Sequence, residues 1–117
     1  MIHYLEFEFP KFEVVASIAG EILAITSSPV LLNEIGGIGY KPVYYFPVKD
    51  VNLEIFLKSD FKSHCYLKGD GNYYSTKIKG ELFEEIAWQY KESFPEAKPL
   101  EGLIAFNLTK VDIQINK

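Results

Sequence analysis

The fold of this chain is constrained most by its short runs of apolar, β-branched and aromatic residues, each soon ended by glycine, proline or a charged residue. In residues 4–9, apolar side chains alternate with tyrosine and glutamate, and this period of two indicates a strand with one buried face. Further strands are predicted at 12–18, 21–25, 43–46, 51–57, 73–78, 103–108 and 111–115. Ala19-Gly20 suits a hairpin turn, and Gly69–Asn72 is predicted to be another. This spacing predicts a mainly β fold of short, mostly antiparallel strands, as a sheet, barrel or sandwich.

Helices are expected to be few. Residues 81–90 fit a helix and a strand equally well, and residues 94–102 could hold one short helical turn, so we expect at most one or two short helices. The Gly-Gly-Ile-Gly segment at 36–39 is expected to be a flexible loop. A chain of 117 residues can bury roughly two-thirds of its unfolded surface, so residues 1–117 are predicted to form a single domain without a metal or disulfide.

The charge balance and the missing residue types exclude several classes of protein. The formal net charge is -4 and the chain contains no arginine, so binding to nucleic acid or acidic membranes is not expected, and an anion site must use lysine or backbone N–H groups. One cysteine cannot form an internal disulfide or a cysteine-rich zinc site, which favours a reducing cytoplasmic setting. No cofactor is predicted. The N-terminus lacks a basic signal-peptide start, and no apolar run reaches the ~20 residues of a membrane helix, so we expect a soluble protein.

Reactive side chains concentrate between residues 60 and 69. Cys65 follows His64 and lies close to Lys68, so its thiolate could be a nucleophile. Adjacent residues in a strand point to opposite faces, however, and the alternative is a buried Cys65 beside an exposed His64. The lysine before the glycine-rich residues 69–72 also suggests a phosphate loop, but the earlier glycine and the following Ser or Thr of that motif are missing.

The sequence holds no strong metal-binding pattern. His3 and His64 are far apart and no Cys-x-x-Cys is present, so a zinc site would need an unusual gathering of carboxylates. Glu6 and Glu8 share one strand face and could hold magnesium, although the solvated face of a strand is the simpler interpretation. We therefore predict no metal site.

Taken in order, the segments of this chain resemble the domain of unknown function 427 family, a group of small uncharacterised bacterial proteins. The motifs that carry the resemblance are Gly20-Glu21-Ile22-Leu23-Ala24, Glu34, Pro42–Pro47 with Asp50-Val51, Cys65–Gly69, Tyr74, Ala87–Tyr90, Pro95-Glu96 and Gly102–Phe106. The chain departs from the family pattern where Tyr66 replaces a usual proline and where Asp70-Gly71 replaces a small residue.

The resemblance implies a mainly β fold, similar in outline to the Mss4-like folded β-tents, with one pocket for a small ligand. That group often binds zinc through paired Cys-x-x-Cys motifs, which this chain lacks. The matching positions are polar or aromatic, which implies a ligand site. Lys68 would bind an anionic metabolite or nucleotide, and aromatic rings would stack on this ligand. Cys65 would be either a nucleophile or part of the pocket wall. The implied catalytic residues are Cys65 and Lys68, and the implied ligand-binding residues are Glu34, Tyr45, Asp50, His64, Trp88 and Tyr90.

Two other functions stay open. A non-catalytic module could bind a protein partner through an edge strand or an aromatic patch. The family is also described as nucleotidyltransferase-like, but the Gly-Ser and Asp-x-Asp pattern of polymerase-type nucleotidyltransferases has no counterpart in this chain. Neither composition nor spacing decides whether the protein is an enzyme.

Overall fold

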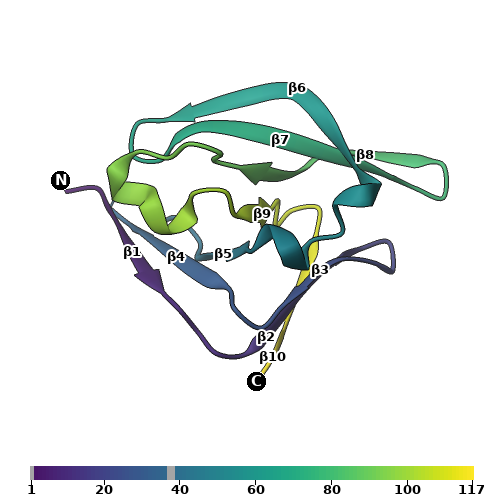
Figure 1. Cartoon of the computed structure of the whole chain (residues 1–117), viewed down its shortest axis with the longest axis horizontal. Coiled ribbons are helices and arrows are strands. Elements are labelled where there is room, and N and C mark those ends of the chain that lie inside the picture. The colour runs from purple at the N-terminus through teal and green to yellow at the C-terminus, as the bar shows by residue number, and fades with distance from the viewer. Residues whose placement is uncertain (1, 37–38) are drawn as a thin grey trace.

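The fold is built from strands. The computed structural model describes residues 2–36 and 39–117, and these contain strands and 3-10 helical segments but no helix of seven or more residues (Figure 1). The elements are β1 (Tyr4–Glu8), β2 (Glu13–Ile18), β3 (Glu21–Thr26), β4 (Val30–Ile35), β5 (Val43–Phe46), η1 (Val48–Asp50), η2 (Leu53–Ile55), β6 (Phe56–Cys65), β7 (Gly69–Ile78), β8 (Glu81–Gln89), η3 (Pro95–Leu100), β9 (Ile104–Phe106) and β10 (Asp112–Asn116). The predicted mainly β class is confirmed, with three short helical segments where one or two were expected.

The strands form two antiparallel sheets. A seven-stranded sheet has the order β1-β4-β5-β9-β8-β7-β6, and a smaller sheet has the order β10-β2-β3. All strand pairs in both sheets are antiparallel, as the hairpin signals predicted. The segment 81–90, which fitted helix and strand equally, is strand β8, because its residues pair with β7 on one side and β9 on the other.

Each face of the large sheet has its own hydrophobic core. One core lies between the two sheets, where Phe46 and Phe106 are buried with their ring centroids 5.2 Å apart. The other core contains Tyr45 and Ala105, neighbours of those two phenylalanines in sequence, and it packs against Leu100 of η3. Period-two alternation therefore sends successive residues of β5 and β9 into different cores.

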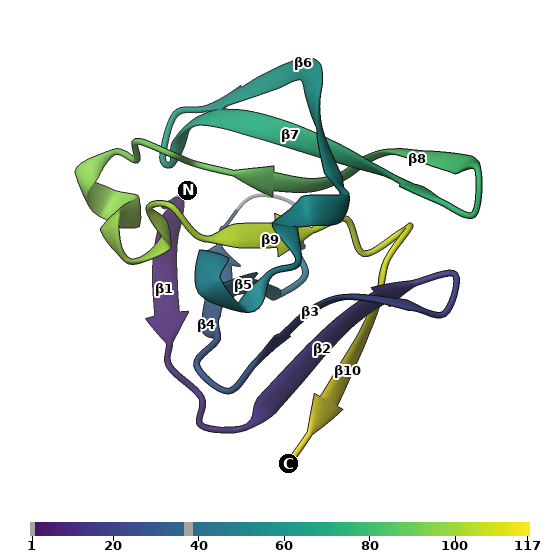
Figure 2. The ribbon, with the colours of Figure 1, turned by 45° about the vertical axis from the view of Figure 1, so that its right-hand side comes forward.

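The large sheet curls so that its two edges approach each other at one end. β1 and β6 are the edge strands, yet the N-terminal end of β1 lies beside the turn between β6 and β7 (Figures 1 and 2). His3, just before β1, forms a hydrogen bond with Tyr66 of that turn. This closure places residues from both ends of the sheet around one cluster of polar side chains.

Two sequence predictions were wrong in position. The hairpin turn lies at Tyr66–Lys68, because Cys65 pairs with Gly69, so residues 69–72 belong to β7. Gly69 has φ +113°, and a Cβ there would lie 3.0 Å from the Glu92 carbonyl oxygen, so the glycine signal marks the residue after the turn. The segment 51–57 is not one strand, since η2 interrupts it before β6 begins. Part of the loop expected at 36–39 lies outside the described residues.

No helix in the described part of the chain is long and apolar enough to span a membrane.

Replacing Phe46 by alanine is expected to destabilise the fold strongly. The ring is fully buried between the sheets against Phe106, so the free energy of unfolding should fall by about 3–5 kcal/mol through the cavity that remains. Urea denaturation measures this loss. Phe9→Ala removes an exposed ring and should change stability far less; equal losses for both variants would contradict this assignment of the core.

Candidate functional site

The side-chain carboxylate of Glu34 is buried, and each of its two oxygens accepts a hydrogen bond from a basic side chain. The Lys68 ammonium donates to Oε1 at 2.7 Å, and the His3 Nε2–H donates to Oε2 at 2.7 Å. The side chains of Glu34, Lys68 and His3 are only 8%, 11% and 17% exposed. A carboxylate in this position needs such partners, because an unpaired buried charge is strongly unfavourable.

The strand register explains why these groups meet. Glu34 shares the inner face of β4 with Leu32, which is 3% exposed, and it lies opposite Leu5 of β1. Continuing the alternation of β1 backwards places His3 on the same face as Leu5, diagonal to Glu34. Gly36, with φ +94°, makes this approach possible, because a Cβ there would overlap the carbonyl oxygen of Ile2.

Two tyrosines surround the His3 ring. Tyr40 stacks on it with a centroid distance of 5.5 Å and an interplanar angle of 5°. Tyr66 meets it edge-on at 5.5 Å, and the Tyr66 hydroxyl forms a hydrogen bond with His3 Nδ1. The imidazole is therefore fixed in both plane and rotation.

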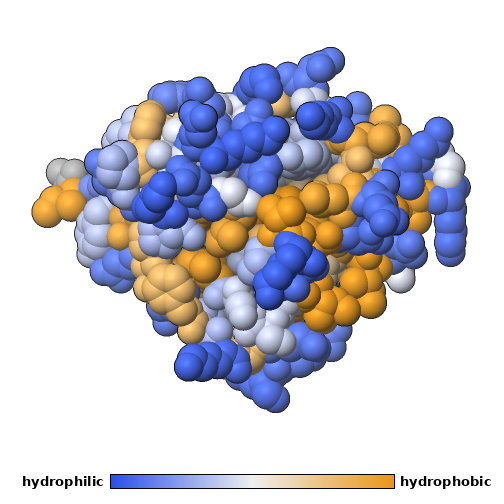
Figure 3. Space-filling model, viewed as in Figure 1, coloured by the Kyte–Doolittle hydropathy of each residue, from blue (hydrophilic) through white to orange (hydrophobic). Residues whose placement is uncertain are grey.

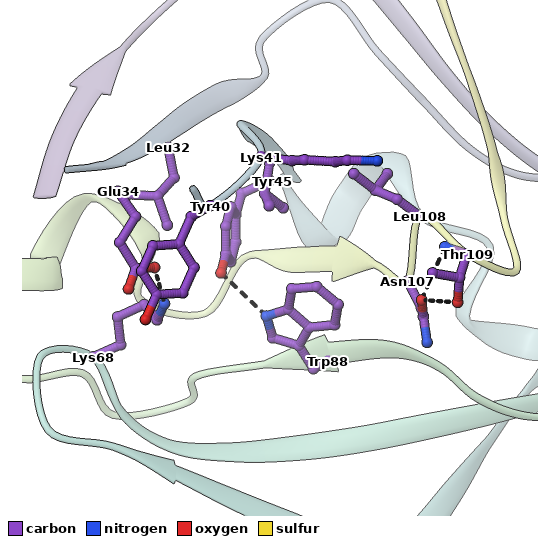
Figure 4. A pocket seen from close by; sticks show the side chains of 11 residues that line it. Leu32, Glu34, Tyr40, Lys41, Tyr45, Lys68, Trp88, Asn107, Leu108 and Thr109 are labelled. Atoms are coloured by element: carbon purple, nitrogen blue, oxygen red, sulfur yellow. Dashed lines mark hydrogen bonds and ion pairs between the residues drawn. The ribbon is translucent and has the colours of Figure 1, made fainter. Parts of the chain in front are cut away.

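A pocket opens beside the Glu34–Lys68 ion pair. It has a volume of about 330 Å³, at the lower end of the range for ligand sites. Figure 4 shows Glu34, Lys68 and Tyr40 at one end, with Lys41 near Asn107 and Thr109 at the other. The lining residues are Leu32, Glu34, Tyr40, Lys41, Val43, Tyr45, Lys68, Trp88, Asn107, Leu108 and Thr109.

The aromatic wall of the pocket depends on a small residue between two large ones. Tyr45 on β5 and Trp88 on β8 both pair with Ala105 of the strand between them. Because alanine leaves space above the sheet, the Trp88 Nε1–H reaches across it and donates to the Tyr45 hydroxyl at 3.1 Å (Figure 4). The two rings meet edge-on with centroids 6.4 Å apart.

The lining carries more positive than negative charge. Two lysines, Lys41 and Lys68, line the pocket together with a single carboxylate, Glu34. Burial raises the pKa of Tyr45 well above its usual value of 10, so its hydroxyl stays neutral and keeps a proton to donate. Burial likewise raises the pKa of Tyr90, which lies behind the lining with the Lys68 ammonium 5.9 Å from its ring centroid.

Three of the predicted ligand-binding residues, Glu34, Tyr45 and Trp88, line the pocket together with Lys68, which was predicted to be catalytic. Tyr90 is buried behind them and packs in the same core as Tyr45. Whether these side chains contact a ligand stays a prediction.

The other predicted site residues do not line this pocket. Asp50 accepts a hydrogen bond from Thr26 Oγ1 at 2.8 Å and borders a separate hollow beside β3. His64 points into solvent and pairs with Asp70 at 2.6 Å. Cys65 is half-buried against the core that contains Tyr45, as expected when adjacent strand residues point to opposite faces.

Sequence reasoning missed several residues of the site. His3 was considered only as a metal ligand, although the alternation of Leu5 and Phe7, extended by one step, could have placed it on the inner face. Tyr40, Lys41, Asn107 and Thr109 lie in connecting segments without periodicity, so only the folded chain reveals them. The described residues contain no group of three or more His, Cys, Asp or Glu side chains that could hold a metal.

Removing the cation of the buried pair should cost stability. Lys68→Met leaves Glu34 with His3 as its remaining partner, so the free energy of unfolding should fall by about 2–4 kcal/mol. The double variant Lys68→Met, Glu34→Gln should recover part of this lost stability, because both charges are then gone. Urea denaturation measures the free energy of unfolding of each variant. Lys98→Met breaks an exposed pair with Glu101 and serves as the control, with a much smaller effect. A double variant less stable than Lys68→Met alone would contradict a buried-charge penalty.

The neutral tyrosines should make stability depend on alkaline pH. Above a pH of about 10 the unfolded chain loses phenol protons that folded Tyr45 and Tyr90 retain, so stability should fall as pH rises through this range. Urea denaturation at several pH values should give Tyr45→Phe a shallower decline than the unmodified protein. Exposed Tyr4→Phe should leave the slope unchanged; an unchanged slope for Tyr45→Phe as well would contradict this account.

Comparison with known proteins gives the chain a family. The family model for the domain of unknown function DUF427, with the short name NTP_transf_9, matches residues 9–117. No curated protein matches the chain. The matched region includes Glu34, Lys68 and Trp88, whereas His3 and β1 precede it. Because the match covers nearly all of the sequence, this chain belongs to the domain of unknown function 427 family, as its ordered motifs predicted.

Proposed function

We propose that this protein binds a small, planar, singly charged anion in the pocket beside Glu34 and Lys68. The observation that carries the proposal is the charge of the lining, which contains two lysines and one carboxylate. In a chain with a net charge of -4, this is a local excess of positive charge. One N–H group of the Lys68 ammonium donates to Glu34, so its other two N–H groups remain to donate to the ligand.

Ring-shaped ligands suit the remaining lining. Tyr40 and Trp88 offer aromatic surface, and Leu32, Val43 and Leu108 provide apolar surface between the two charged ends. Asn107 Oδ1 accepts hydrogen bonds from the N–H and the hydroxyl of Thr109, so its amide NH₂ remains a donor at the Lys41 end. An aromatic carboxylate or a comparable monoanion would satisfy these groups.

Binding rather than catalysis is the proposal. Cys65, the predicted nucleophile, lies outside the residues that line the pocket. We expect the protein to act in the reducing cytoplasm, which suits its single free thiol.

Nucleotide binding remains an alternative, since the short name of the family refers to nucleotidyl transfer. Polymerase-type transfer uses carboxylates that hold two magnesium ions. The described residues do not gather three potential metal ligands, so we derive no transfer step and keep nucleotides as one arm of the test.

A protein-interaction face is the second candidate. Exposed apolar residues of β3, η1 and η2 coincide with an apolar area in Figure 3, and they include Ile22, Ile25, Val48 and Leu53. A partner that covers this face would make the pocket incidental.

A melting-temperature screen tests the binding proposal. Benzoate and indole-3-carboxylate are the planar monoanions, benzamide is the uncharged control, and AMP and ATP are tested with and without magnesium. A ligand that binds only the folded state at 100 times its Kd stabilises the protein by about 2.7 kcal/mol, so at least one monoanion should raise Tm clearly.

Variants locate the binding. Lys68→Met and Trp88→Ala should abolish the monoanion-induced rise in Tm, whereas Lys98→Met, at an exposed pair, should retain it. A rise with ATP and magnesium alone would favour nucleotide chemistry instead. No response to any compound would favour the interaction face.

A further inference from the structure

His3 links a hydroxyl to a carboxylate on the side of Glu34 away from Lys68. The chain of hydrogen bonds runs from the Tyr66 hydroxyl to His3 Nδ1, and from His3 Nε2 to Glu34 Oε2 at 2.7 Å. A nucleophile, a base and a group that orients the base are the three parts of an activated hydroxyl.

The partners fix which ring nitrogen carries the proton. An ionised carboxylate only accepts hydrogen bonds, so Nε2 of His3 carries the hydrogen and donates to Glu34. In the neutral imidazole, Nδ1 then has a lone pair, and the Tyr66 O–H donates to it. This is the tautomer that can take a proton from the hydroxyl.

Neighbouring contacts hold the imidazole in place. Tyr40 stacks parallel to the ring, and Lys68 holds the other oxygen of Glu34 at 2.7 Å. The base and its orienting group are therefore buried and restrained, as a catalytic group requires.

The Tyr66 end of this series of hydrogen bonds is exposed to solvent. Tyr66 lies in the β6–β7 turn and is 65% exposed, whereas His3 is 17% exposed at its side chain. A substrate could thus reach Tyr66 without entering the pocket. His3 precedes residues 9–117, which the family model matches, so the match does not include this imidazole.

We propose that Tyr66, His3 and Glu34 form an acyl-accepting triad for small activated esters. The Tyr66 oxygen bonds to the acyl carbon while its proton passes to His3 Nδ1, and the leaving alcohol takes its electron pair from the broken ester bond and the proton from His3. In the second half, water attacks the acyl-tyrosine, His3 receives the proton of the water, and the Tyr66 oxygen leaves and is reprotonated. Glu34 keeps the imidazole oriented throughout and is a positioning residue.

The probe is 4-nitrophenyl acetate, whose acyl transfer releases 4-nitrophenolate. Acid quenching and peptide mass spectrometry then locate the acetyl groups. Tyr4, which is 42% exposed, is the internal reference, because the hydrogen bonds of the His3 ring go to Tyr66 and Glu34. General-base assistance should acetylate Tyr66 on the order of tenfold or more faster than Tyr4.

Two variants separate proton transfer from packing. His3→Gln can still donate to Glu34 and accept from Tyr66, but it cannot take up a proton, so Tyr66 acetylation should fall to the rate of Tyr4. Glu34→Gln should slow it as well, and Tyr66→Phe should remove the label. Acetylation of Tyr66 no faster than that of Tyr4, or an unchanged rate in folded His3→Gln, would overturn the triad. Trp88→Ala tests the pocket separately, because Trp88 contacts neither His3 nor Tyr66 in the hydrogen-bonded series, so either proposal can fail alone.

Discussion

The hydrogen-bonded ion pair between Lys68 and Glu34 joins two parts of the large sheet that the strand order keeps apart. Glu34 lies on β4, next to one edge strand, and Lys68 lies in the turn before β7, next to the other. Because β4 and β7 are not neighbours in the sheet, backbone hydrogen bonds do not join them, and the two side chains make the connection instead. Because both groups are nearly desolvated, each depends on the other for its opposite charge, and the pocket opens beside them.

The pocket itself follows from the size of one side chain. Tyr45, Ala105 and Trp88 form a row across three neighbouring strands, and a larger residue at the central position would fill the space that Trp88 now spans. The Trp88 N–H donates to the Tyr45 hydroxyl, and among the described residues no buried side-chain nitrogen or oxygen lacks a hydrogen-bond partner. A close-packed sheet thereby gains a cavity without losing hydrogen bonds.

Much of the fold could be predicted from the sequence, because side-chain alternation is a local property. It identified β1 and β10, and short apolar runs bounded by turn residues or proline identified β2, β3 and β5. The β6–β7 turn was placed three residues late because Gly69 follows the bend rather than forming it. Glu34, Tyr45, Lys68 and Trp88 were identified through the family resemblance and do line one pocket. His3 and Tyr66 could not be connected in advance, since their contact spans 63 positions and depends on how the sheet curls.

The two oxygens of Glu34 belong to different chemical settings. Oε1 faces Lys68 and the pocket, both within the part of the chain that the family model matches. Oε2 faces His3, which lies before that part. The edge strand β1 therefore brings an imidazole to the carboxylate from outside the pocket lining. The carboxylate must serve both sides, so a substitution at Glu34 or at its partner Lys68 affects pocket and triad together, whereas a substitution at His3 affects mainly the triad.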